Sequence, residues 1–358
     1  MQYKKIVIKV GTNVISKENG LLDYEIIKNL VEQISFLKNN QVEIILVSSG
    51  AVGAGRSMIN LDSNINTVVK RQILASIGQP RLLNIYSEMF EKNNYLCAQI
   101  LATKEDFRDR LHYLNMKNCF NALLQDNIIP IVNENDVVSV TELMFTDNDE
   151  LAGLIASMLN VDALIILTNV DGVYKGHPKD KDSKLIDEID IKKPEFKQFI
   201  SPEKSQFGRG GMLTKYGIAE KMSLVGINTH ILNGKKNDNL KKLLLGEKIG
   251  TRFLIKKDVS NIKKWIAYSE GYEKASVYIN QGAEEALLLK EKAISLLPVG
   301  ISSIKGDFEK GDIIRICNDK NDYLGLGLAQ YNSNKANSII GKKGQKALIH
   351  YNYIFLKN

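Results

Sequence analysis

The strongest constraint on the fold is an alternation of short β-branched runs with longer segments of helical period, which continues to about residue 235. A chain that alternates strands with covering helices forms an α/β unit with a mostly parallel sheet. We therefore expect such a sheet in this part of the chain. The strand candidates are Ile6–Ile8, Glu43–Val47, Ile128–Val132, Ala163–Leu167 and Thr229–Leu232.

The pattern changes after Gly234. Residues 235–264 carry ten basic and three acidic side chains, and they lead into short apolar runs that glycines interrupt. Runs such as 276–279, 312–316 and 323–328 predict a small β-barrel. A length of 358 residues also favours two domains. The expected division is 1–246 for the first domain, 247–262 for a linker and 263–358 for the second domain.

Composition excludes several classes of protein. With 44% hydrophobic residues, 25% charged residues and 6 prolines, the chain is neither disordered nor collagen-like. No window approaches a membrane span, and Met1 leads to Ile6–Ile8 without the separate apolar segment of a signal peptide. The 3 cysteines are widely spaced, which favours reduced thiols. We expect a cytoplasmic protein that binds no membrane.

The first strand candidate delivers Lys9 to a turn formed by Gly11 and Thr12. In an open α/β sheet, ligands bind at the carboxyl ends of the strands. Gly11 has no Cβ, so backbone N–H groups at this turn can approach an anion closely beside the lysine. The alternative is a solvated lysine at a strand end, because lysines are mostly surface residues.

The second strand candidate runs into a turn of small residues that contains Ser49 and Gly50. Its glycine order is not that of a dinucleotide fingerprint, and the sequence contains no Walker A loop. A helix that opens at such a turn offers free N–H groups to a phosphate or carboxylate. Close packing between strand and helix would also require glycine, so both interpretations stay open.

Two clusters of carboxylate and amide side chains follow, at Asn133–Asp136 and at Asp147–Glu150. A helix N-cap at Asp147 or Asn148 explains the second cluster by itself. It does not explain both clusters. Carboxylates and amides at neighbouring strand ends could bind an ammonium group, or could organise lysines and a magnesium ion.

A glycine-rich cationic segment, 208–215, precedes a predicted helix. Arg209, Thr214 and Lys215 in this segment suit a polyphosphate, and the alternative is a surface loop. Together with Lys9, the segment gives two lysines at two separate glycine turns. This pairing indicates phosphoryl transfer, in which positioning and charge neutralisation carry most of the catalysis.

Six motifs in their order along the chain resemble the amino acid kinase family, and within it the members that phosphorylate free glutamate. The motifs are Lys9-Val10-Gly11-Thr12, Ser49-Gly50-Ala51, Asn133-Glu134-Asn135-Asp136, Thr146-Asp147-Asn148-Asp149, Thr168-Asn169 with Asp171 to Tyr174, and Gly210-Gly211-Met212 with Thr214-Lys215. The C-terminal unit resembles a PUA domain. The residues that carry this second resemblance are Gly282-Ala283, Ser295 to Pro298, Gly306, Phe308, Gly311-Asp312 and Gly327-Leu328-Ala329.

The resemblance implies a three-layer sandwich with a mostly parallel central sheet, followed by a small C-terminal β-barrel. It implies transfer of a phosphoryl group from ATP to the γ-carboxylate of L-glutamate, giving L-glutamyl 5-phosphate, in the first step of proline biosynthesis. ATP and Mg²⁺ are the implied cofactors. Proline is the implied feedback inhibitor, and a homo-oligomer, dimer or tetramer, is the implied assembly.

The resemblance also assigns roles to residues. Lys9 and Lys215 would contact the transferring phosphoryl group, and Asp149 would hold the two lysines. The glutamate-binding positions are Ser49, Asp136 and Asn148. The nucleotide-binding positions are Lys9, Thr168, Asn169, Arg209, Gly210, Gly211, Met212, Leu213, Thr214 and Lys215, and the anion-binding turns are Gly11, Thr12 and Gly50. No protein ligand for a metal is assigned.

Two positions depart from the family pattern. The family usually has Asp at position 169 and Thr at position 209, where this chain has Asn169 and Arg209. Both positions belong to the nucleotide side of the implied site. The acceptor side keeps the family pattern.

The implied reaction agrees with the residue chemistry. A γ-carboxylate with a pKa of about 4.3 is ionised at neutral pH, so the nucleophile needs no general base and none of the 4 histidines needs a role. Kinases of the same family that act on N-acetylglutamate, aspartate or a nucleoside monophosphate remain alternatives. Because the net charge is +7, RNA binding is a further alternative. However, residues 263–358 hold fourteen basic and ten acidic side chains, a modest excess.

Overall fold

The computed structural model describes residues 1–62, 64–138, 145–176, 178, 180, 182–191, 211–255, 266, 269, 271, 273–288 and 294–356. The chain divides into two compact units. One comprises Met1–Lys104 with Met116–Asp258, and the other comprises Glu105–Asn115 with Val259–Asn358. The linker at 247–262 stays a prediction: residues 256–262 lie outside the described residues, and Thr251–Phe253 form a strand in the sheet of the first unit.

The first unit is built on an eight-stranded sheet with the order β3-β4-β2-β1-β5-β9-β10-β8. Neighbouring strands are parallel except β9 and β10. The strands are β1 Lys5–Val10, β2 Glu43–Ser48, β3 Cys97–Ala102, β4 Ile129–Glu134, β5 Ala163–Thr168, β8 Glu188–Ile189, β9 Asn228–Asn233 and β10 Thr251–Phe253. All five strand candidates are confirmed as β1, β2, β4, β5 and β9, and β3, β8 and β10 were not predicted.

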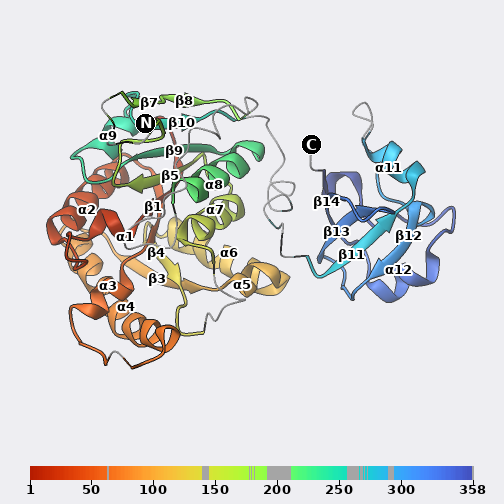
Figure 1. The fold of residues 1–358 in the computed structure, drawn as a ribbon, viewed down its shortest axis with the longest axis horizontal. Helices are drawn as coiled ribbons and strands as arrows, with labels where there is room; N and C mark the ends of the chain where they lie inside the picture. Colours follow the sequence, from red (N-terminus) through yellow and green to blue (C-terminus); the bar gives the residue numbers. More distant parts are fainter. Residues whose placement is uncertain are drawn as a thin grey trace. The chain divides into compact units, whose positions relative to one another are not determined.

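Helices cover both faces of this sheet, which confirms the expected three-layer α/β fold (Figure 1). In Figure 1, α2 and α9 lie on one side of β1 and β5, and α7 and α8 lie on the other. The helices between the N-terminus and β10 are α1 Thr12–Ile15, α2 Tyr24–Asn39, α3 Ala51–Arg56, α4 Thr67–Glu91, α5 Lys104–Arg108, α6 Arg110–Gln125, α7 Asn148–Leu159, α8 Met212–Leu224 and α9 Asn239–Leu244.

The alternation of side chains along β1 decides which groups face α7. Ile6, Ile8 and Val10 belong to the core cluster that also holds residues of α2, α4 and α9. Successive side chains of a strand point to opposite faces, so Lys9 lies on the other face. That face is the one on which α7 packs against β1. The strand therefore carries Lys9 to the N-terminal end of α7.

Two glycines let α3 and α4 pack backbone to backbone. A Cβ on Gly78 of α4 would lie 1.8 Å from the carbonyl oxygen of Ala51, and one on Gly55 of α3 would lie 2.0 Å from that of Leu74. No side chain fits at either position, because real Cβ atoms do not approach a carbonyl oxygen so closely. This contact fixes the N-terminal half of α4 beside the strand ends.

The second unit contains a five-stranded mixed sheet with the order β12-β11-β13-β14-β15. Its elements are β11 Ala275–Ile279, α11 Gln281–Leu288, β12 Ile301–Lys305, β13 Ile313–Asn318, β14 Tyr323–Leu328, α12 Ser333–Ile339 and β15 Ile354–Leu356. The apolar runs 276–279, 312–316 and 323–328, which predicted a small β-rich unit, form β11, β13 and β14. In both units, no described helix is long and apolar enough to span a bilayer. All three cysteines are free thiols.

A buried histidine lies in β9. His230 is 2% exposed, its Nε2 lies 2.8 Å from the Tyr3 hydroxyl, and its Nδ1 has no hydrogen-bond partner. Burial, together with the charge of Arg252, lowers the pKa of His230 to about 4. The folded protein therefore holds this imidazole neutral at pH values where the unfolded chain protonates it.

We expect His230 to make the fold sensitive to acid. The unfolded histidine takes up its proton near pH 6.5, and the folded one only near pH 4, so stability present above pH 6.5 is lost as the pH falls between these values. At pH 5 this loss is about 2 kcal/mol. Denaturant midpoints at pH 7 and pH 5 measure it. His230→Gln should show a smaller difference between the two pH values, and an unchanged difference would contradict the assignment.

Candidate active site

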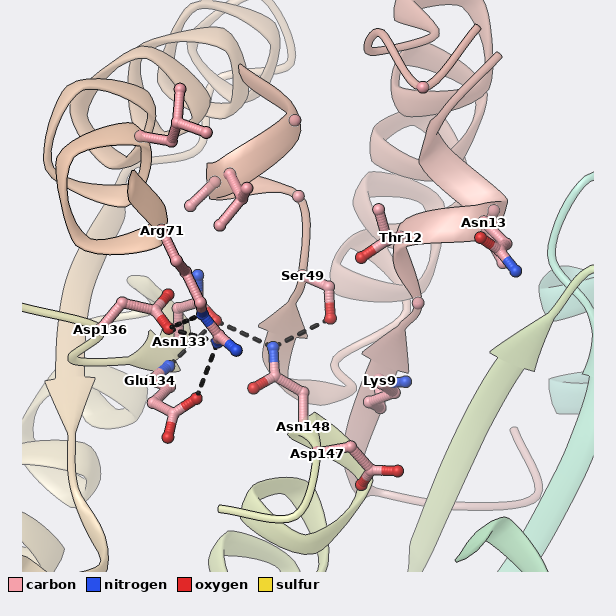
Figure 2. Close-up of a pocket in the computed structure, with 18 of the residues that line it drawn as sticks. Lys9, Thr12, Asn13, Ser49, Arg71, Asn133, Glu134, Asp136, Asp147 and Asn148 are labelled. Atoms are coloured by element: carbon pink, nitrogen blue, oxygen red, sulfur yellow. Dashed lines mark hydrogen bonds and ion pairs between the residues drawn. The ribbon is translucent and has the colours of Figure 1, made fainter. Parts of the chain in front are cut away.

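A cavity of about 400 Å³ opens at the carboxyl ends of the central strands of the first unit. It receives residues from the ends of β1, β2, β4 and β5 and from the first turns of α3, α7 and α8. Figure 2 shows labelled side chains that converge on it from the ends of β1, β2 and β4, from α1 and α4, and from the start of α7. The residues predicted from sequence that line it are Lys9, Gly11, Thr12, Ser49, Gly50, Asp136, Asn148, Thr168, Asn169 and Lys215.

Two lysines share one carboxylate at the floor of this cavity. Lys9 Nζ lies 2.6 Å from Asp149 Oδ1, and Lys215 Nζ lies 2.9 Å from Asp149 Oδ2. Asp149 has no exposed surface, and Lys9 and Lys215 are 5% and 9% exposed. The alternative of a solvated lysine at the end of the first strand is therefore wrong. The structure brings together two cations that are 206 positions apart in sequence.

The charged groups in this cluster shift one another's pKa values. Burial raises the pKa of Asp149, but the two ammonium groups outweigh burial and hold it at about 2. Burial lowers the pKa of Lys9, and Lys215 lowers it further, whereas Asp149 raises it. Asp149 is thus a fixed anion that opposes, without cancelling, the lowering of the Lys9 pKa by burial.

Asp147 places Asp149 by capping α7. Its Oδ1 accepts hydrogen bonds from the backbone N–H groups of Asp149, at 2.9 Å, and Glu150, at 3.2 Å. The predicted N-cap is therefore confirmed at Asp147. Burial and the neighbouring charge of Asp149 raise the pKa of Asp147. The cap and the paired carboxylate occupy the same helix N-terminus, so the motif serves both as a structural cap and as part of the cavity.

The glycines of the anion-binding turns leave room at the cavity wall. A Cβ on Gly11 would lie 3.4 Å from Lys9 Nζ. Gly50 has a φ of 113°, a left-handed conformation that favours glycine, and a Cβ there would lie 2.7 Å from Ile15 Cδ1. The turn at Gly50 is thus required by packing and also lines the cavity, so the two interpretations of this turn are compatible.

A chain of amide hydrogen bonds crosses the cavity wall beside the lysines (Figure 2). Asn148 Nδ2 donates to Ser49 Oγ at 2.9 Å and to Asn133 Oδ1 at 2.8 Å. Asn133 Nδ2 in turn donates to Gln79 Oε1 at 2.8 Å. An amide NH₂ carries two hydrogens, so Asn148 satisfies both acceptors and its own carbonyl oxygen stays available. Ser49 and Asn148 are held together although 99 positions separate them.

Arg71 of α4 is a cavity residue that sequence reasoning missed. Its Nε donates to Asp136 Oδ1 at 3.1 Å, and its Nη2 lies 3.4 Å from Glu134 Oε2 (Figure 2). Nothing in a single sequence separates such an arginine from a solvated one on a helix surface. Arg71 is recognised from the three-dimensional structure, because the α3–α4 contact packs α4 against the strand ends.

The residues predicted to bind the nucleotide are described in part. Thr168 and Asn169 line the cavity, and Thr168 Oγ1 donates to Asn169 Oδ1 at 3.4 Å. Gly211 is the N-cap of α8, and its N–H donates to Thr214 Oγ1 at 3.0 Å. Met212 and Leu213 stand in the first turn of α8, outside the cavity lining. Arg209 and Gly210 lie outside the described residues.

Comparison with known proteins identifies the family of this chain. The model of the amino acid kinase family matches residues 4–233, which include both lysines and every described residue of the cavity. The chain belongs to the amino acid kinase family. A second family model, that of the PUA domain, matches residues 275–351 in the C-terminal unit.

Relatives of this amino acid kinase extend over the whole chain. Glutamate 5-kinase of Chlorobaculum tepidum is 53% identical over 358 residues, which cover 99% of this chain and 98% of that protein. Glutamate 5-kinase of Bacteroides thetaiotaomicron is 47% identical over 99% of both chains. Carbamate kinase from Giardia lamblia, solved bound to AMP-PNP, matches 71% of this chain and 99% of its own with a TM-score of 0.53. At 19% identity this last likeness shows the fold alone.

We expect Asp149→Asn to destabilise this kinase strongly. The substitution leaves two buried ammonium groups without their counter-ion, and removing one partner of a buried pair costs about 3 to 5 kcal/mol. Asp171→Asn is the matched control, because Asp171 pairs at 2.7 Å with Lys236, whose side chain is 58% exposed. Such a pair contributes at most about 1 kcal/mol. Denaturant unfolding of both variants measures the difference, and equal losses would contradict the role of Asp149.

Proposed function

We propose that this protein transfers the γ-phosphoryl group of ATP to the γ-carboxylate of L-glutamate and releases ADP and L-glutamyl 5-phosphate. The single observation that carries the proposal is the Lys9–Asp149–Lys215 cluster at the floor of a cavity with acceptor-binding side chains. The full-length relatives named glutamate 5-kinase favour glutamate over the other acceptors of the family. The reaction would open proline biosynthesis.

The chemistry requires charge cancellation and not proton transfer. An oxygen of the ionised γ-carboxylate attacks the γ-phosphorus, the new P–O bond forms, and the bond to the leaving ADP oxygen breaks. Nucleophile and phosphate are both anionic, so their repulsion is the barrier that the site must lower. Lys9 and Lys215 approach one carboxylate from its two oxygens, which gathers two positive charges at one place.

Asp149 has a positioning role in this proposal. Its low pKa keeps it ionised, and its charge raises the pKa of Lys9 against the larger effect of burial. A third ion pair with substrate then needs no rearrangement of the lysine side chains. Preorganised charges of this kind stabilise the transition state without paying for reorientation during the reaction.

Ser49, Asn148 and Asp136 are proposed to hold glutamate. The amide chain from Asn133 to Ser49 offers neutral hydrogen-bonding groups, and Asp136 offers a carboxylate to the α-ammonium group. Thr168, Asn169 and the start of α8 are proposed to hold the nucleotide. Asn169 lacks the negative charge of the usual family residue, so its contact would be a neutral hydrogen bond.

The cavity fits a magnesium ion held mainly by phosphate oxygens. Both oxygens of Asp149 are paired with lysines, and Asp147 Oδ1 caps α7, whereas Asp147 Oδ2 is buried without a hydrogen-bond partner. Asp147 would hold the ion, and Mg²⁺ commonly takes one or two carboxylates plus substrate phosphates. When bound, the ion neutralises charge on the phosphates.

An ADP-release assay over a panel of acceptors tests the proposal. We expect turnover with L-glutamate and not with N-acetylglutamate, aspartate or nucleoside monophosphates. Lys9→Ala should lower kcat at least about 100-fold while glutamate binding, measured by calorimetry, survives. Lys5→Ala is the control on the same strand, because Lys5 pairs with Glu43 at the surface. A near wild-type kcat for Lys9→Ala would contradict the role of Lys9.

Three further proposals rest on the family resemblance. Proline would inhibit by competing near the glutamate site, the protein would form a homo-oligomer, and it would act in the cytoplasm. Millimolar proline added to the same assay tests the first of these. An unchanged initial rate at subsaturating glutamate would contradict it.

A further inference from the structure

Arg71 occupies a place in the cavity that the proposed reaction does not use. It stands in the first turns of α4, and its guanidinium group reaches two carboxylates that follow β4, those of Glu134 and Asp136. The side chains of Glu134 and Asp136 are 1% and 10% exposed, and that of Arg71 is 29% exposed. The cation therefore covers two carboxylates that are largely shielded from water.

The helix is tied to this segment at three points. Next to Arg71, Gln72 Nε2 donates to the carbonyl oxygen of Val137 at 2.8 Å. Two turns further along α4, Gln79 accepts the hydrogen bond from Asn133. The polar side chains of α4 thus contact the segment from Asn133 to Val137 along its length. The acceptor side of the cavity takes its shape from this helix.

The bonding of Arg71 leaves one oxygen of Asp136 for a ligand. Arg71 Nε and Nη2 both donate to the same atom, Asp136 Oδ1. Because both bonds end on Oδ1, they hold the carboxylate beside the guanidinium group, and Oδ2 receives no hydrogen bond from Arg71. An ammonium group carries three N–H donors, and a carboxylate oxygen such as Oδ2 can accept one of them.

The carboxylate of Asp136 is complementary to an ammonium ion. Its side chain lines the cavity and is 10% exposed, and its pairing with Arg71 engages Oδ1. An α-ammonium group at Oδ2 would add a second ion pair. An N-acylated acceptor has no such cation and would leave Oδ2 without that partner, which a buried site disfavours.

We propose that Arg71 is a positioning residue that aims Asp136 at the α-ammonium group of the acceptor. The pocket thereby selects acceptors with a free ammonium group. This inference rests on the proposed function, since it presupposes an amino acid acceptor.

A double-mutant cycle in the full chain tests this role. Arg71→Gln, Asp136→Asn and the double variant are compared with wild type by kcat/KM for glutamate at saturating ATP. We expect each single substitution to lower kcat/KM about 10- to 100-fold, the range for a hydrogen bond to a charged group. The double variant should be no worse than Asp136→Asn alone, because Arg71 acts through Asp136. The KM for ATP should not change in any variant.

Controls separate this role from a structural one. Arg81→Gln alters an exposed arginine of the same helix that donates to Tyr24 at 3.2 Å, and it should match wild type. Arg71→Lys keeps the charge but not the planar fork, and it should restore part of the lost kcat/KM. If Arg71→Gln does not fold, Arg71→Lys replaces it in the cycle, where the same non-additivity is expected.

Additive effects in the cycle would overturn the proposal, because they would mean that Arg71 acts independently of Asp136. A KM for ATP that rises together with the KM for glutamate would also overturn it, as a general structural defect. Failure of the proposed function is a separate result, in which the wild-type protein itself does not phosphorylate glutamate. Wild-type activity with an unaffected Arg71→Gln variant would reject only the role of Arg71.

Discussion

The ion pairs that Asp149 makes with two buried lysines are the interaction on which the catalytic end of this kinase depends. Burying ammonium groups is costly, and placing two of them side by side adds their repulsion. Asp149 stabilises both, with Nζ–O distances of 2.6 and 2.9 Å. The fold supplies all three groups separately. Strand alternation in β1 directs Lys9 toward α7, the Asp147 cap sets the start of α7, and α8 brings Lys215.

Two groups of ion pairs lie at separate places in the cavity. Lys9 and Lys215 pair with Asp149, and Arg71 pairs with Glu134 and Asp136. Neutral amides and a hydroxyl group, those of Asn133, Asn148 and Ser49, lie between them. We propose that this arrangement orients an acceptor that has an anionic end and an ammonium end.

Much of the fold follows from the sequence, because buried parallel strands read as continuous apolar runs. Every residue of β4 and β5 is buried, and both strands were predicted. The edge strand β3 is half-exposed and has one β-branched residue, Ile100, so it lacks the β-branched run of the other strands. The strands β8 and β10 have 2 and 3 residues, too few for a period to appear.

Cavity residues at the ends of strands could be predicted from the sequence, whereas residues on the side of a helix could not. Glycines and charges at strand ends pointed to Lys9, Ser49 and Asp136. Arg71 and Gln79 look like ordinary surface residues of α4, and the packing of α4 places Arg71 in the cavity and Gln79 against Asn133. Sequence also left open whether Lys9 is solvated, because burial of a lysine depends on a partner that lies 140 positions away.

The most direct measurement is a crystal structure of the full chain with ADP, glutamate, magnesium and aluminium fluoride, which mimics the phosphoryl group in transfer. We expect Lys9 Nζ and Lys215 Nζ both to lie within hydrogen-bond distance of the fluoride ligands while Asp149 still contacts both lysines. The glutamate γ-carboxylate should face the aluminium. Aluminium fluoride bound away from the two lysines, or a lysine pair no longer joined by Asp149, would contradict this account.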